Sequence, residues 1–116
     1  NSQNLANIAW AFATAGISSM RLFEAIATEA QLKIRDLNSQ NLANMAWAFA
    51  TAGISSTQLF EAIATQAQSK MHTLNPQNLA NLAWAFATAG ISSTRLFEAI
   101  APEAQLKIRA FNPHNP

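Results

Sequence analysis

Two asparagines recur in each third of this 116-residue chain, in the run Asn-Leu-Ala-Asn that begins at Asn4, Asn41 and Asn78. Asparagine is costly inside a helix, because its side chain competes for backbone hydrogen bonds. Its amide, however, offers donors and an acceptor together, which matches the edge of a nucleic-acid base. We therefore predict base-facing polar columns made of Asn4, Asn7, Thr14, Asn41, Asn44, Thr51, Asn78, Asn81 and Thr88. For the Asn4 column a structural role stays open, in which each amide ties its helix to the next repeat or to a loop carbonyl.

A tryptophan follows each pair of asparagines, at Trp10, Trp47 and Trp84. The simpler interpretation is packing between adjacent helices, because an indole buries a large area. The alternative is an exposed ring on which an unstacked base lies, a contact worth about 1–3 kcal/mol per base. Both interpretations are compatible with a position at the border of the polar stripe.

Cations recur near the end of each third, and we treat them as phosphate candidates: Lys33, Arg35, Lys70, His72, Lys107 and Arg109. A strand lying along the repeats would place one phosphate near each of them, with strong salt dependence of binding. The alternative is a favourable interaction of each cation with a helix C-terminus, together with packing of its aliphatic stem.

Catalysis finds no support in the residue types. The chain has no cysteine, its two histidines lack a recurring partner set, and its three glycines form no phosphate-binding loop. We therefore expect no enzyme, no metal or other cofactor and no small-molecule substrate. No apolar run approaches the roughly 18 residues that span a bilayer, so we expect no membrane partner. The formal charge of +1 says little by itself, but no stretch of the sequence resembles a polybasic arm.

The same pattern returns every 37 residues, because Asn1, Asn38 and Asn75 open equivalent segments. A period of this length is typical of a solenoid, in which each unit buries its apolar face against its neighbours. We expect an all-α fold, namely an α-solenoid of antiparallel helix pairs. Its units would be residues 1–37, 38–74 and 75–111, followed by the start of a truncated fourth unit at 112–116, all in one continuous domain.

Each unit is predicted to contain two helices. In the first unit, helix A runs from about residue 2 to residue 15 and helix B from about 20 to 35. Asn75 and Pro76 are typical of an N-cap and a first helical position, and Ser18 or Ser19 can cap helix B. Left-handed glycines end helix A at Gly16, Gly53 and Gly90. Proline inside a helix removes a hydrogen bond, so we predict kinked or broken second helices near Thr28, Thr65 and Pro102.

A helical wheel separates two faces of helix A. The predicted core face holds Leu5, Ile8, Ala9, Phe12 and Ala15. The opposite face holds Gln3, Asn4, Asn7, Ala11 and Thr14, which carry amides and a hydroxyl but no formal charge. Such a face is unusual for plain solvent exposure, where glutamate and lysine are the better helix formers.

The run Asn-Leu-Ala-Asn-x-Ala-Trp-Ala-Phe-Ala-Thr-Ala-Gly, followed by Leu-Phe-Glu-Ala-Ile-Ala, resembles the octotricopeptide repeats and their 37-residue relatives, the heptatricopeptide repeats. The resemblance covers the whole chain. It implies single-stranded RNA binding, one base per repeat, in RNA processing, stability or translation in a chloroplast or mitochondrion. Because the polar positions are the same in all three units, the chain should prefer a run of like bases. We expect this stretch to carry no targeting segment and to be a piece of a longer protein.

Two other functions stay open. Ala-Trp-Ala-Phe-Ala-Thr also resembles the inner helix of armadillo repeats, which implies peptide binding, although Thr14, Thr51 and Thr88 stand where that family has asparagine. An assembly scaffold is the other possibility, since uncapped terminal units expose apolar surface and favour end-to-end association.

Overall fold

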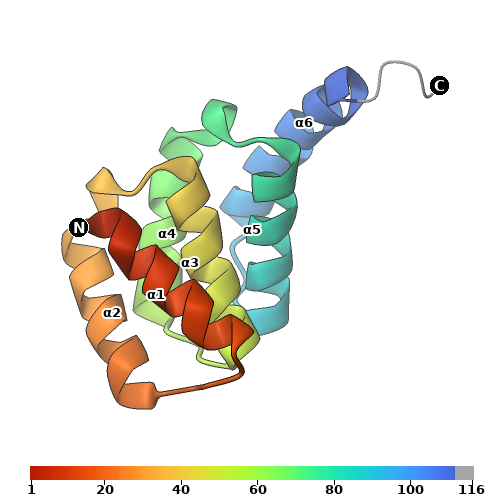
Figure 1. Ribbon diagram of the computed structural model, residues 1–116. Coiled ribbons are helices and arrows are strands. Elements are labelled where there is room, and N and C mark those ends of the chain that lie inside the picture. Colours follow the sequence, from red (N-terminus) through yellow and green to blue (C-terminus); the bar gives the residue numbers. More distant parts are fainter. Residues whose placement is uncertain (112–116) are drawn as a thin grey trace.

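A computed structural model describes residues 1–111, with side chains as far as Arg109, and this part of the chain is all-helical (Figure 1). The predicted start of a fourth unit at 112–116 lies outside the described residues. The α-helices are α1 (Ser2–Thr14), α2 (Met20–Leu32), α3 (Ser39–Ala52), α4 (Thr57–Ser69), α5 (Pro76–Ala89) and α6 (Thr94–Phe111). Short 3-10 helices follow α2 and α4, at Ile34–Asp36 (η1) and Met71–Thr73 (η2).

The helices form two layers. Helices α1, α3 and α5 begin at residues 2, 39 and 76, so that successive starts are 37 residues apart. In this layer α3 packs between α1 and α5, and in the other layer α4 packs between α2 and α6 (Figure 1). The equivalent elements of successive units therefore lie side by side.

Local capping confirms the predicted helix starts and ends. Asn38 and Asn75 are N-caps whose side-chain oxygens accept from the backbone N–H three residues on, each at 2.7 Å. Pro76 occupies the first turn of α5, where a missing N–H has no cost. Gly53 ends α3 with a φ of 75°, a left-handed conformation that side chains avoid. Ser19 caps α2, with its hydroxyl 3.4 Å from the Leu22 nitrogen.

The second helices do not break where the sequence predicts. Helices α2 and α4 continue through Thr28 and Thr65, whose hydroxyls donate to carbonyls four residues back at 3.0 and 3.1 Å. Helix α6 contains Pro102 within its length, and a bend there stays a prediction. Instead α2 and α4 end early, at residues 32 and 69, and a 3-10 turn replaces the expected last helical turn.

The core is complete only in the middle of the array. Leu42, Met45 and Phe49 are fully buried, as the wheel predicts for their face. Ile8, however, is 41% exposed and Ala15 is exposed. The prediction that these two belong to the core is wrong because α1 lies at the edge of its layer, where no described helix covers its outer side.

Loops also connect neighbouring units. The Ser18 hydroxyl donates to the Ala52 carbonyl at 3.0 Å, and Ser55 makes the equivalent bond to Ala89 at 3.4 Å. The turn after each first helix therefore binds the end of the next first helix. These contacts fix the relative position of helices that carry the polar face.

Candidate nucleic-acid interface

A groove of about 370 Å³ crosses the N-terminal halves of α1, α3 and α5. We call it the amide groove, and its lining consists of Asn7, Trp10, Gln40, Asn44, Asn75, Gln77, Asn78 and Asn81. The structure thus brings together the predicted column Asn7, Asn44 and Asn81 from three different helices. Every lining side chain is neutral, and all but the tryptophan are primary amides that can both donate and accept. Such a surface can recognise hydrogen-bonding edges without an ionic contribution.

The first asparagine column differs between the units. Asn4 is exposed, whereas Asn41 and Asn78 are each only 8% exposed. The difference arises because α1 covers α3 and α3 covers α5, while no described helix covers α1 from its outer side. Within the described residues, no fully buried side-chain nitrogen or oxygen lacks a hydrogen-bond partner. Burial limits the access of a ligand to Asn41, whereas the equally buried Asn78 contributes to the groove wall. The structural role of this column stays a prediction.

The threonine column lies away from the amide groove. Thr14, Thr51 and Thr88 are all exposed, and none of them lines the groove. Each follows its groove asparagine by seven residues, which is about 10 Å along a helix axis. Their base-facing role stays a prediction for a ligand that extends beyond the groove.

The three tryptophans stack on one another along the array, and we call them the tryptophan ladder. The ring centroids of Trp10 and Trp47 are 4.3 Å apart with planes tilted by 30°, and those of Trp47 and Trp84 are 6.3 Å apart at 31°. Contact at 4.3 Å leaves no room for a base between the first two rings. The rings remain accessible from the side, since Trp10 is 38% and Trp84 is 47% exposed. The ladder combines packing between helices with an exposed aromatic edge beside the groove.

The sequence prediction missed three groove residues, namely Asn75, which was predicted only as an N-cap, and two glutamines. Gln40 and Gln77 line the amide groove, and each lies four residues before the groove asparagine of its own helix. Residues at this spacing share one helix face, with Cβ atoms about 5–6 Å apart. The signal was present in the sequence, because Gln3 begins the same column and belongs to the same uncharged face.

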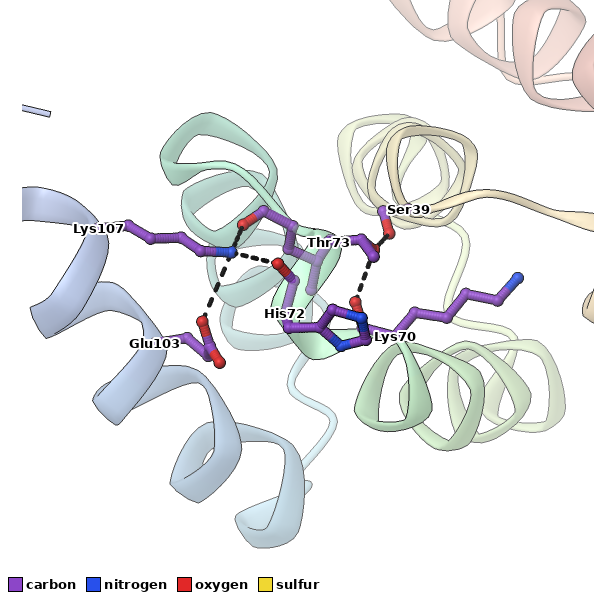
Figure 2. Close-up of polar contacts among 7 residues, drawn as sticks. Ser39, Lys70, His72, Thr73, Glu103 and Lys107 are labelled. Atoms are coloured by element: carbon purple, nitrogen blue, oxygen red, sulfur yellow. Dashed lines mark hydrogen bonds and ion pairs between the residues drawn. The ribbon is translucent and has the colours of Figure 1, made fainter. Parts of the chain in front are cut away.

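The lysine column mainly joins the units. The Lys70 ammonium donates to the Leu37 carbonyl at 2.7 Å and to the Arg35 carbonyl at 3.2 Å. Lys107 makes the equivalent bonds to the carbonyls of Leu74 and, at 2.9 Å, His72 (Figure 2). Each ammonium thus binds the 3-10 turn region of the preceding unit.

The remaining phosphate candidates have different surroundings. Lys107 also pairs with Glu103 at 3.5 Å, and Lys33 pairs with Glu29 at 3.5 Å (Figure 2 shows the former). Arg35, His72 and Arg109 are exposed, in η1, η2 and α6. Their phosphate role stays a prediction.

A second cavity of about 430 Å³ adjoins the amide groove. It shares Gln40 and Asn78 with the groove and also includes Lys70 and Thr73. Thr73 bonds both the Lys70 carbonyl, at 2.7 Å, and the Ser39 hydroxyl (Figure 2). An ammonium has three N–H donors, and two of those on Lys70 are bonded to carbonyls. Lys70 is therefore a predicted cation that lies in a cavity adjoining the amide groove.

Over the described residues, no three histidine, aspartate or glutamate side chains gather closely enough to hold a metal ion. None of the helices described here has the length and apolar character needed to cross a membrane.

A comparison with protein families gives a match over residues 1–113 to the model described as RNA-editing substrate-binding complex 6 protein (RESC6). The chain belongs to the RESC6 family. No curated protein matches it. The RESC6 match agrees with an RNA-related role, but it is not a match to the octotricopeptide or heptatricopeptide families specifically, and it gives no support to a chloroplast location.

Proposed function

We propose that this RESC6-family chain is a single-stranded RNA-binding module of an RNA-editing complex, and that it binds RNA through the amide groove. The observation that carries this proposal is the joining of Asn7, Asn44 and Asn81 with two glutamines and a tryptophan in one neutral groove. Primary amides match base edges, and an aromatic edge beside them suits an unstacked base. The family description supports an RNA setting and protein partners. The chain would act as a binding module and not as an enzyme, in a mitochondrial setting.

The proposed architecture is an α-solenoid of three 37-residue units, 1–37, 38–74 and 75–111, as in the octotricopeptide-like repeats. Its support is the start of α1, α3 and α5 at that period and the recurrence of the bond from Ser18 to Ala52 at Ser55 and Ala89. Each unit would contact one base. Because the groove amides are the same in each unit, the preferred target is a run of like bases, and the phosphate backbone would pass Lys70 in the adjoining cavity.

Binding is tested by fluorescence anisotropy with labelled homopolymeric RNA, matched DNA and unrelated peptides. We expect saturable binding to one RNA homopolymer. Asn44→Ala should weaken it about tenfold, equivalent to about 1.4 kcal/mol, because one base loses its amide partner. Alanine is the better helix former, so the fold should persist. The matched control is Gln58→Ala, which removes an exposed amide from α4 in the other layer and should leave affinity unchanged.

Salt dependence separates base recognition from general attraction to phosphate. A single strand gives a slope of about −0.7 in log affinity against log salt for each phosphate neutralised. Because the groove is neutral and one lysine adjoins it, we expect a slope of about −0.7, the value for one neutralised phosphate. A steep slope with no effect of Asn44→Ala would refute the amide groove as the site, and saturable binding to peptides alone would favour the armadillo-like function.

A further inference from the structure

The amide groove and the second cavity meet at two side-chain amides, because Gln40 of α3 and Asn78 of α5 line both of them. The charge differs on the two sides of this boundary. The groove is lined by neutral amides and a tryptophan, whereas the second cavity includes Lys70 and has no carboxylate in its described lining. A ligand that spans the boundary would therefore meet hydrogen-bonding groups at one end and a positive charge at the other.

Asn78 brings an unpartnered amide to this boundary. Only 8% of the residue is exposed, and its backbone N–H donates to the side-chain oxygen of Asn75 at 2.7 Å. Its own side-chain amide makes no hydrogen bond to another residue of the described chain, in which every fully buried side-chain nitrogen or oxygen has a partner. The Asn78 amide therefore keeps contact with the spaces that it lines. A ligand group that both donates and accepts would satisfy it.

Lys70 keeps a positive charge that the following lysine of its column shares with a glutamate. Lys107 pairs with Glu103 at 3.5 Å, whereas Gln66 stands at the position of that glutamate in the middle unit. The start of α3 at Ser39 lies in the same cavity and adds the partial positive charge of a helix N-terminus. The second cavity is therefore suited to an anionic group such as a phosphate.

A nucleotide presents its groups in the same order, because its ribose connects a neutral base to an anionic phosphate. We propose that one nucleotide of the bound RNA spans the boundary, with its base in the amide groove, its phosphate in the second cavity and its 2′-hydroxyl bonded to the side chain of Asn78. The 2′-hydroxyl both donates and accepts, as a primary amide does, and it is the group that DNA lacks. Asn78 would therefore be the residue that distinguishes RNA from DNA.

This inference rests on the proposed function, and its test compares the affinities for RNA and for DNA with the same repeated base, measured by fluorescence anisotropy. We expect the parent chain to prefer RNA. Asn78→Ala should lower that preference about fivefold, the equivalent of one hydrogen bond, while the affinity for DNA stays nearly the same. Asn78→Leu keeps a similar shape and provides a second variant if the first does not fold.

The repeat offers matched controls for both ends of the nucleotide. Asn41 is equivalent to Asn78 and equally buried, but it lines neither the groove nor the second cavity, so Asn41→Ala should keep the preference of the parent chain. Gln66→Glu places a carboxylate beside Lys70, as in the third unit. It should weaken the binding of RNA and DNA alike and bring the salt slope from about −0.7 towards zero. Gln58→Glu makes the same change at an exposed position of α4 and should leave the slope unchanged.

The outcomes separate this inference from the proposed function. A parent chain that binds RNA and DNA equally overturns the inference and leaves RNA binding intact. The same holds if the Asn78 variants keep the preference for RNA, if Asn41→Ala lowers it as much as they do, or if Gln66→Glu leaves the salt slope unchanged. A parent chain that binds no RNA overturns the proposed function, and the inference with it.

Discussion

Replacing Lys70 by methionine should destabilise the fold, whereas the same replacement of Lys33 should hardly change it. The two lysines occupy equivalent places after α2 and α4, and they differ in their partners. Lys70 donates to the Leu37 carbonyl at 2.7 Å and the Arg35 carbonyl at 3.2 Å. Lys33 has a half-exposed ion pair with Glu29 at 3.5 Å. Methionine keeps an unbranched apolar stem, so the comparison isolates the ammonium.

The magnitude follows from these contacts. A hydrogen bond to a charged group contributes about 1.5–3 kcal/mol, and the two bonds of Lys70 share one partly exposed ammonium, so they do not add fully. We expect Lys70→Met to lower the free energy of unfolding by about 2 kcal/mol. This corresponds to a fall of roughly 10 °C in the melting temperature of a chain of this size. For Lys33→Met we expect less than about 0.5 kcal/mol, the usual contribution of an exposed pair four residues apart on a helix.

The assay is denaturant unfolding followed by circular dichroism at a fixed, low protein concentration, so that association between chains does not contribute. The test compares the loss in free energy of unfolding between Lys70→Met and Lys33→Met. Equal losses for Lys33→Met and Lys70→Met would show that the lysine acts within its own helix, as a cation near a helix C-terminus, and would refute the joining role. A similar slope of free energy against denaturant in both variants confirms that the same surface unfolds.

Two backbone predictions are tested by the same unfolding assay. Gly53→Ala should lower the free energy of unfolding by about 1 kcal/mol, because a φ of 75° strains any residue with a side chain. Nothing lies within 4 Å of the added methyl group, so a steric clash does not contribute. An unchanged stability would contradict the left-handed conformation of Gly53. Pro102→Ala should raise the free energy of unfolding by about 1–3 kcal/mol, because it restores an N–H that can donate to the carbonyl of Glu98 in α6. A loss of stability would show that the proline is required for packing.

The predictable part of this fold depends on local chemistry. Asn75 and Pro76 start α5 through a side-chain cap and a fixed φ, and both effects act within one helical turn. Gly53 and Gly90 end their helices in the left-handed conformation, which glycine adopts readily because it has no side chain. Such features need no knowledge of neighbouring units, so the sequence patterns located them correctly.

Apart from the amides that line the groove, the missed features depend on neighbours along the array. The early end of α4 at Ser69 places Lys70 against carbonyls 33 and 35 residues away in the chain, a contact that no wheel of one helix can reveal. The exposure of Ile8 depends in the same way on the absence of a described helix outside α1. Residues at equivalent positions of a repeated sequence can differ in burial and in hydrogen-bond partners. Those differences become visible only when the helices are packed together.

The surroundings of each residue also narrow the set of side chains that are candidates for contacting a base. Asn41 is 8% exposed between packed helices, and Thr51 lies outside the amide groove, so neither is well placed to meet a base in that groove. The side chains of the middle unit that line the groove are Gln40 and Asn44, two amides on one face of α3. In RNA-binding proteins that read one base per helical repeat, two or three side chains specify the base. A glutamine and an asparagine recur in this arrangement at Gln77 and Asn81, so α3 and α5 offer the same pair of hydrogen-bonding groups. This repetition is the basis of the proposed preference for a run of like bases.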